Sequence, residues 1–187
     1  RAFRNEEFDC IEIANRAARL RAANKLITGG HRRIGLIASN IEYTGMERMK
    51  GFSDALTDAG LTVPEEYCVY GKHSFELGYQ GMRRLLELPS PPTAVILSNY
   101  DTTLGGIMAV NESRFSCPGD ISIIGFDDLL MSKVIRPRLW TIAQPMREMS
   151  ERAVELLLKR ISHQEKGGPL RISFSAGIRE GDSIRKL

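Results

Sequence analysis

Residues 120–128 read Asp120-Ile121-Ser122-Ile123-Ile124-Gly125-Phe126-Asp127-Asp128, an apolar run that ends in two carboxylates. A run of this length, entered through Pro118-Gly119, indicates a strand rather than a helix. The earlier run Ile34-Gly35-Leu36-Ile37-Ala38 has the same form and also ends in polar residues, Ser39-Asn40. Both runs predict strands with polar groups at their carboxyl ends.

Segments with helical periodicity alternate with such runs along the whole chain. Strands are predicted at 10–13, 34–38, 67–70, 93–97, 121–126, 138–143 and 171–176, and helices at 16–28, 46–59, 77–88, 102–112 and from Pro145 to Ile161. This alternation predicts an α/β protein whose sheets are mostly parallel, with helices on both faces.

The composition excludes several classes of protein. The 187 residues are 42% hydrophobic and 26% charged, which argues against disorder, and a net charge of +3 is too weak for a nucleic-acid footprint. No apolar run is long enough to cross a membrane. The three cysteines, Cys10, Cys68 and Cys117, are widely spaced and odd in number, which fits a reducing cytoplasm better than a disulfide framework. Neither a metal nor a cofactor is expected.

Polar residues gather just past the predicted strand ends. They are Asn15, Ser39-Asn40, His73, Ser98-Asn99-Tyr100-Asp101 and Asp127-Asp128, with Arg48 in an adjoining helix. Ligands of parallel sheets bind beyond the carboxyl ends of the strands, where loops and helix N-termini converge. Amides and carboxylates exchange hydrogen bonds with hydroxyl groups, so this set favours a sugar-like ligand.

Each of these residues also has a simpler interpretation. Asn15 is more simply a helix N-cap than a ligand contact, and Asp127 can be a turn or capping residue. Arg48, next to Glu47, can belong to a solvated helix face, and His73 to a surface loop.

Motifs for catalysis are absent from the sequence. It contains no GxSxG, GxxxxGK[ST], GxGxxG or HExxH pattern, and only one of its three histidines, His73, follows a predicted strand. We therefore expect a binding protein rather than an enzyme.

Several ordered motifs resemble those of the lactose-repressor/galactose-repressor (LacI/GalR) family of bacterial transcription regulators. They are Gly30-His31-Arg32-Arg33-Ile34-Gly35, Glu47-Arg48-Met49-Lys50-Gly51-Phe52, Pro92-Thr93-Ala94-Val95, the run at 120–128, Pro137-Arg138-Leu139-Trp140-Thr141 and Gln144-Pro145. Each motif alone is weak, but the ordered series is specific and covers almost the whole chain.

The resemblance implies an effector-binding domain with the fold of periplasmic sugar-binding proteins, in which two subdomains joined by crossover strands clamp a small ligand. It predicts residues 1–65 as a partial N-terminal subdomain and 66–136 as the C-terminal subdomain. Residues 137–164 are then predicted to contribute a crossover strand and a helix to the N-terminal subdomain. Residues 165–187 are predicted to contribute a strand and the tail to the C-terminal subdomain. A helix-turn-helix headpiece that reads operator DNA normally precedes such a domain. The resemblance implies that neither that headpiece nor the first strands of the domain lie within these 187 residues.

By position, the resemblance implies which residues contact the ligand. Arg48 matches an arginine that forks onto ligand hydroxyls or carboxylates, Asn99 an asparagine of the cleft, and Asp127 the aspartate of the Gly-Phe-Asp-Asp motif. His73 stands where many members place an aromatic residue. The family's Asp-Asn pair reads Ala14-Asn15 here, and its Asn-Asp pair reads Asn99-Tyr100, with Asp101 one position later. Arg48 and Asp127 are expected on opposite subdomains.

The resemblance also implies a homodimer. Its interface is expected to include Leu104, Ile107 and Met108 of one helix, and Met131, Val134 and Ile135 of the segment 131–136. The alternative is that these apolar residues face the subdomain's own core.

For the whole protein, the resemblance predicts a cytoplasmic repressor that senses a small carbohydrate effector and has no membrane contact. The alternative is a solute-binding protein of a sugar transport system, which shares the fold. A third class, an α/β enzyme, has only the fold in its favour.

Overall fold

The structure is a computed structural model that describes residues 7–128 and 134–187. Its elements are β1 (Cys10–Ile13), α1 (Asn15–Thr28), β2 (Ile34–Ala38), α2 (Tyr43–Asp58), the 3-10 turn η1 (Glu65–Tyr67), β3 (Cys68–Tyr70), α3 (Phe75–Leu86), β4 (Ala94–Leu97), α4 (Tyr100–Asn111), β5 (Ser122–Phe126), β6 (Trp140–Ala143), α6 (Met146–Ile161), β7 (Arg171–Phe174) and β8 (Gly177–Arg179). The predicted α/β class is confirmed.

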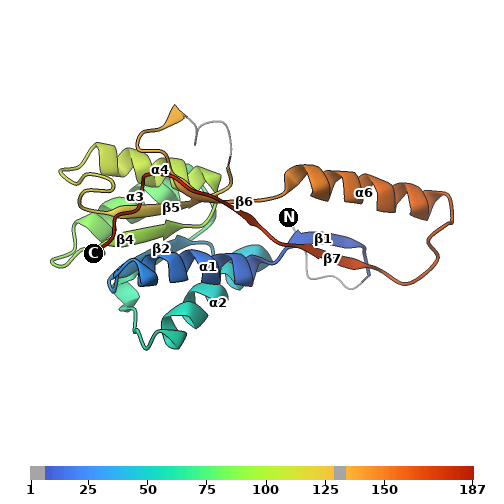
Figure 1. Ribbon diagram of the computed structural model, residues 1–187, viewed down its shortest axis with the longest axis horizontal. Coiled ribbons are helices and arrows are strands. Elements are labelled where there is room, and N and C mark those ends of the chain that lie inside the picture. The colour runs from blue at the N-terminus through green and yellow to red at the C-terminus, as the bar shows by residue number, and fades with distance from the viewer. Residues whose placement is uncertain (1–6, 129–133) are drawn as a thin grey trace.

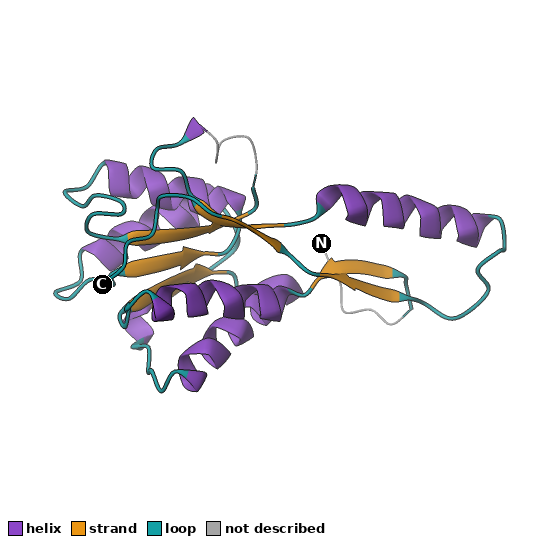
Figure 2. Cartoon of the chain, viewed as in Figure 1, coloured by secondary structure: helices purple, strands orange, loops and turns teal. Residues whose placement is uncertain are grey.

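One sheet of six strands forms the larger part of the molecule. Its order is β3-β2-β4-β5-β6-β8, and every neighbouring pair is parallel except β6 with β8. Helices α1 and α2 cover one face of this sheet, and α3 and α4 cover the other (Figures 1 and 2). The expected arrangement of helices on both faces is confirmed.

The alternation of side chains across the strands builds a separate core on each face. The register aligns Leu36 with Ile96 and Ile96 with Ile124, and all three pack with α1 and α2. Their neighbours Ile37 and Leu97 point the other way and pack with α3 and α4. Both cores are needed because a central parallel sheet buries both of its faces.

The sheet order shows that the predicted boundary between residues 65 and 66 is wrong. Strand β2 lies between β3 and β4, so residues 15–65 belong to the same subdomain as residues 66–128. Strands β6 and β8 complete this sheet, so the prediction for 137–164 is wrong for β6, although α6 does lie in the other part of the molecule. The prediction for 165–187 fits β8 but is wrong for β7, which pairs with β1. Periodicity identifies strands but not their neighbours, which explains the error.

A second, smaller part consists of β1, β7 and α6. β1 and β7 pair in parallel with Ile11 opposite Ile172, and α6 packs against β1 (Figure 1). This part extends away from the six-stranded sheet, to which α1, β6 and β8 connect it.

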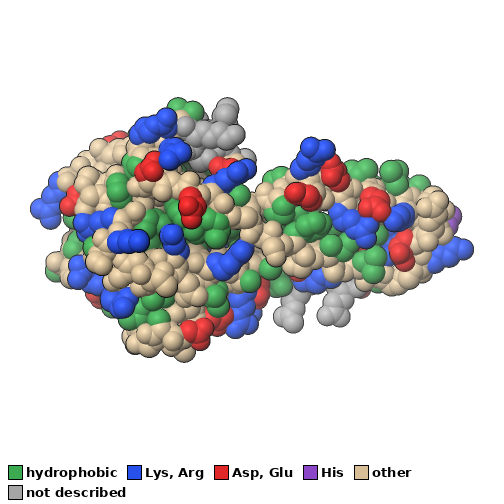
Figure 3. All heavy atoms as spheres, in the orientation of Figure 1, with side chains coloured by type: hydrophobic (Ala, Val, Ile, Leu, Met, Phe, Trp, Pro, Cys, Tyr) green, Lys and Arg blue, Asp and Glu red, His purple; other side chains and the backbone are tan. Residues whose placement is uncertain are grey.

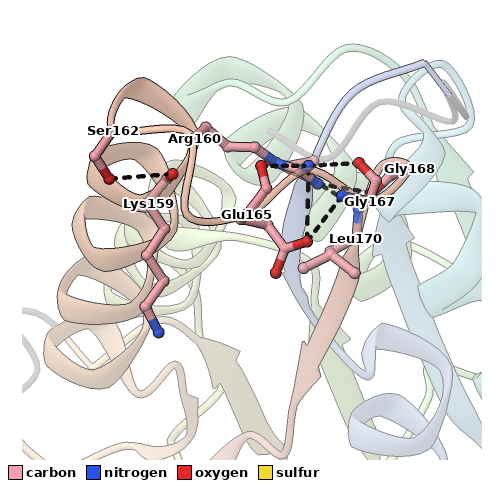
Figure 4. A network of polar contacts seen from close by, with 8 residues as sticks. Lys159, Arg160, Ser162, Glu165, Gly167, Gly168 and Leu170 are labelled. Atoms are coloured by element: carbon pink, nitrogen blue, oxygen red, sulfur yellow. Dashed lines mark hydrogen bonds and ion pairs between the residues drawn. The ribbon is translucent and has the colours of Figure 1, made fainter.

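Arg160, near the end of α6, ties this second part together. Its guanidinium donates to both carboxylate oxygens of Asp9 at 2.9 and 2.8 Å. It also donates to the carbonyl oxygens of Gly167 and Gly168 at 2.6 and 2.7 Å (Figure 4). The same Asp9 carboxylate accepts a hydrogen bond from the backbone of Leu170, at 2.7 Å. These bonds join α6, the following loop and the start of β7. The bonds that the Asp9 carboxylate accepts, first from Arg160 and then from Leu170, lower its pKa.

Large apolar side chains are exposed along α6. Val154, Leu157, Leu158 and Ile161 are each more than half exposed. Figure 3 shows apolar side chains lying among charged ones on this arm of the molecule. A helix with such a face normally packs against a further layer of protein.

No helix within residues 7–128 and 134–187 has the length and apolar character that crossing a bilayer requires.

Glycines allow the helices on each face to approach closely. A Cβ atom at Gly51 in α2 would lie 2.0 Å from the carbonyl oxygen of Arg16 in α1. On the other face, a Cβ atom at Gly105 in α4 would lie 2.0 Å from the carbonyl oxygen of Phe75 in α3. Backbone occupies the space of a side chain at both crossings, so no larger residue fits without moving a helix.

We predict that Gly51→Ala lowers the free energy of unfolding by about 1–3 kcal/mol, because the methyl group forces α1 and α2 apart. Urea unfolding followed by circular dichroism measures the change. Gly168→Ala is the matched control, since no heavy atom lies within 4 Å of a Cβ there. Equal stability of the two variants would contradict the close packing of α1 on α2.

Candidate ligand-binding cavity

A cavity of about 390 Å³ lies at the carboxyl end of the six-stranded sheet, where the sheet meets the smaller part of the molecule. It is lined by Ile11, Glu12, Ile13, Asn15, Glu42, Thr44, Arg48, His73, Asn99, Asp101, Asp127, Gln144, Met146 and Met149. All six residues expected to contact a ligand are among them. The structure thus brings together side chains from six separate segments of the chain.

Arg48 lies at the buried side of this cavity and is only 6% exposed. It extends from α2, and its guanidinium stacks on the ring of Phe126, with Cζ 3.5 Å from the ring centroid. Nε donates to Oδ1 of Asn15 at 2.8 Å, and Nη1 donates to the carbonyl oxygen of Ser98. The interpretation of Arg48 as part of a solvated helix face is therefore wrong.

Burial lowers the pKa of Arg48 to about 10, while the nearby carboxylate of Asp127 acts in the opposite direction. Arg48 remains a cation at neutral pH. Within the described residues, Nη2 is the one nitrogen of this guanidinium that has no hydrogen-bond acceptor in the protein.

Asn15 connects Arg48 to the smaller part of the molecule. Its Nδ2 donates to the carbonyl oxygen of Ile13 at 3.1 Å, while its Oδ1 accepts from Arg48. The N-cap position of α1 is Ala14, and Asn15 is the first helical residue. The expectation that Asn15 caps this helix is therefore wrong, because its side chain turns toward the buried arginine instead.

Arg19 is a second buried arginine that the sequence did not reveal. It follows Asn15 by one helical turn, is 0% exposed, and places Cζ 5.6 Å from the centroid of Phe126. Nη1 donates to the carbonyl oxygen of Leu97 at 3.4 Å, whereas Nε and Nη2 have no partner within the described residues. Burial, and secondarily the like charge of Arg48, lower the pKa of Arg19 to about 9.

Asn99 lies between β4 and α4, and Asp101 lies in the first turn of α4. Oδ1 of Asn99 accepts hydrogen bonds from the backbone and the hydroxyl group of Thr102, at 3.1 and 2.7 Å, and so caps α4. The amide nitrogen of Asn99 is then the group left to donate to a ligand. Asp101, in the first helical turn, is exposed at the edge of the cavity.

Asp127 follows β5 in an unusual backbone conformation, with φ at 73°. Oδ1 accepts a hydrogen bond from the side chain of Gln144 at 2.5 Å. Asp128 instead pairs with Arg179 at 2.9 Å, so the two adjacent carboxylates point apart, as a strand end predicts. The expectation that Arg48 and Asp127 lie on opposite subdomains is wrong, because α2 and β5 belong to the same one.

His73 stands after β3, with Nδ1 3.5 Å from a carboxylate oxygen of Glu42. Glu42 also accepts a hydrogen bond from the hydroxyl group of Ser39. Only about a tenth of the His73 side chain is exposed, so the interpretation of this residue as a surface loop residue is wrong.

Several residues of the cavity, and Arg19 behind it, were missed by sequence reasoning. Gln144 directly follows β6, so the rule that selected the other strand ends could have found it. Met146 and Met149 reach the cavity from α6, and nothing in their helical spacing distinguishes them from core residues. Arg19 lies among alanines on a helix, where a charged residue is usually exposed.

The residues expected at a dimer interface divide between surface and core. Met108 is 45% exposed and Val134 is 64% exposed, whereas Ile107 is 7% exposed and packs in the core beneath α4. The assignment of Ile107 is therefore wrong. Leu104 is partly exposed, and Ile135 packs partly against the core. Met131 lies outside the described residues.

Within residues 7–128 and 134–187, no group of three or more histidine, cysteine or acidic side chains could hold a metal ion. The polar groups of the cavity are amides, carboxylates and a buried guanidinium. Such a set can bind a polar molecule through many hydrogen bonds.

Comparison with known proteins finds similarity to a family of binding domains and to transcriptional repressors. A family described as "Periplasmic binding protein-like domain" matches residues 23–184. The chain is 36% identical over 167 residues to the HTH-type transcriptional repressor CytR of Escherichia coli K12, covering 89% of this chain and 49% of that protein. It is 37% identical over 145 residues to the HTH-type transcriptional repressor PurR of Mannheimia succiniciproducens, covering 77% and 43%. The chain spans about half the length of the curated relatives that it matches.

Solved structures of transcriptional regulators have a similar fold. The structure of the transcriptional regulator CelR in complex with cellobiose superposes with a TM-score of 0.88 at 27% identity, covering 95% of this chain and 54% of that one. A LacI-family transcriptional regulator from Enterococcus faecium with bound ribose gives a TM-score of 0.85 at 29% identity, covering 96% and 66%.

We predict that Arg19→Met raises the free energy of unfolding by about 1–2 kcal/mol, since methionine fills a similar space without an unpaired buried charge. Chemical denaturation of the full chain measures the change. Arg16→Met is the matched control on the same helix, because Arg16 is exposed and pairs with Asp54. A loss of more than about 1 kcal/mol in Arg19→Met would show that Arg19 stabilises the fold.

Proposed function

This chain belongs to the LacI/GalR family of transcriptional regulators, and on that premise we propose that its cavity binds a sugar or sugar derivative as the effector. The observation that carries the proposal is the convergence of Asn15, Arg48, Asn99 and Asp127 on one cavity. These groups supply both donors and acceptors, which a molecule with several hydroxyl groups requires. The relatives that contain cellobiose and ribose support a ligand of this class.

The position of the cavity suggests how binding becomes a signal. Residues of the six-stranded sheet line one side, and residues of β1 and α6 line the other. A ligand that contacts both sides favours the arrangement in which they lie close together, and so shifts the conformational equilibrium. In the whole regulator this shift would change the geometry of DNA-binding headpieces. The chain then acts by binding and not by catalysis, in the cytoplasm where operator DNA lies.

The alternative, a solute-binding protein for sugar transport, has the same fold. The names of the relatives, which are transcriptional repressors, favour the regulator.

We predict that Arg48→Met and Asp127→Asn each weaken effector binding about 30- to 150-fold, because either change leaves polar groups of the ligand unpaired at a cost of about 2–3 kcal/mol. Isothermal titration calorimetry of the full chain measures this, after a thermal-shift screen of sugars and sugar derivatives identifies the ligand. Asp128→Asn is the matched control, since Asp128 pairs with Arg179 and does not line the cavity. Unchanged affinity in both cavity variants would contradict the proposed site.

We propose in addition that the chain forms a homodimer through the exposed apolar residues of α4 and the segment near 134. In Met108→Glu combined with Val134→Glu, buried charges at the interface should convert the dimer to a monomer without loss of helix content. Sedimentation velocity and far-UV circular dichroism measure the two properties. Leu187→Glu adds a charge at another exposed apolar residue and should leave the dimer intact. A dimer that survives the double change would rule out this interface.

A further inference from the structure

Two buried arginines share one aromatic ring behind the proposed effector site. Cζ of Arg48 lies 3.5 Å from the centroid of Phe126, and Cζ of Arg19 lies 5.6 Å from it. Their exposed fractions are 6% and 0%. Among the described residues, neither arginine forms an ion pair with a carboxylate. Two desolvated cations in one place cost free energy unless a negative charge lies near them.

The carboxylates around the cavity only partly compensate these charges. Glu12 pairs with Arg171 at 2.8 Å. Glu42 accepts a hydrogen bond from Ser39 and lies 3.5 Å from His73, and its charge is not among those that act on the pKa of Arg48 or of Arg19. Asp101 is exposed to solvent at the edge, where water screens its charge.

Asp127 is the carboxylate whose charge acts on Arg48, and within the described residues none acts on Arg19. The buried side of the cavity therefore holds two cations against one carboxylate.

The orientation of Arg48 allows an anion to bind there. A guanidinium stacked on a ring keeps its N–H groups in its own plane, available for hydrogen bonds at its edge. Two of its nitrogens are held by Asn15 and Ser98, which leaves Nη2 for a ligand. Anionic oxygens form the strongest hydrogen bonds with such a group.

We propose that the effector carries an anionic group, a carboxylate or a phosphate, which binds at Arg48 and is favoured by the positive charge of Arg19 behind it. Hydroxyl groups at the other end of the ligand face Asp127 and Asn99. Arg19 is then a specificity-determining residue that acts through its charge and touches no part of the ligand. This inference rests on the proposed effector-binding function and adds the charge of the ligand to it.

Matched ligands test the charge preference directly. Calorimetry on the full chain at fixed pH and ionic strength compares galactose, galacturonate and galactose 6-phosphate, and then glucose, glucuronate and glucose 6-phosphate. We expect an anionic member to bind about tenfold or more tightly than its neutral sugar, which corresponds to about 1.4 kcal/mol. The uronate and phosphate arms show which anion the site takes.

Variants of Arg19 test its part in that preference. Arg19→Met should weaken the anionic ligand about tenfold and change the neutral sugar less than about twofold, because only the charged ligand feels the lost cation. Arg19→Lys should keep most of the preference, and Arg16→Met, an exposed change on the same helix, should keep all of it. Thermal unfolding confirms that each variant is folded.

Three results would overturn the inference. Neutral sugars that bind as tightly as their anionic counterparts would refute it while leaving the sugar-binding function in place. Equal weakening of neutral and anionic ligands by Arg19→Met would show that the residue acts through packing and not through charge. If no member of either set binds, both the inference and the proposed function fail.

Discussion

The buried guanidinium of Arg48 joins parts of the chain that are far apart in sequence. It holds Asn15, where the smaller part of the molecule meets the sheet, and the carbonyl oxygen of Ser98 at the end of β4. It also stacks on Phe126 of β5. Burying a charged group costs free energy that hydrogen bonds offset, so the three segments that contact Arg48 stabilise it only while they keep these positions. The geometry of the cavity depends on this one side chain.

The strand ends around Arg48 explain why the cavity suits a polar ligand. Parallel strands end together, and the turns that follow them carry amides and carboxylates whose positions are fixed by the rigid sheet. The smaller part closes the cavity from the other side with Ile13 and Met149. Apolar surface on one side and converging polar groups on the other are typical of sites that bind small molecules. The buried charge of Arg19 costs free energy, and the fold alone does not require it. Such costs are usually found at functional sites.

Much of this could be predicted from the sequence, for identifiable reasons. Short apolar runs followed by polar residues are visible without a structure, and the rule for strand ends placed Asn99 and Asp127 in one site. The order of strands in a sheet leaves no periodic signal in the sequence, so the sequence-based division places β2 and Arg48 in a different subdomain from Asp127. Asn15 at a helix start predicts a cap, and only the tertiary contact with Arg48 shows otherwise. Arg19 is hidden because helical position does not reveal which charged residues are buried.

Amide hydrogen exchange of the full chain, with and without its tightest ligand, tests the central claim most directly. If the effector binds where the strand ends meet the smaller part, protection should increase together at residues 13–15, 98–101, 126–128 and 144–149. Protection must appear on both sides of the cavity, because a ligand that closes it contacts both. Protection confined to one side, or located instead in the apolar groove beside Phe52, Leu61 and Tyr70, would contradict this account of the site.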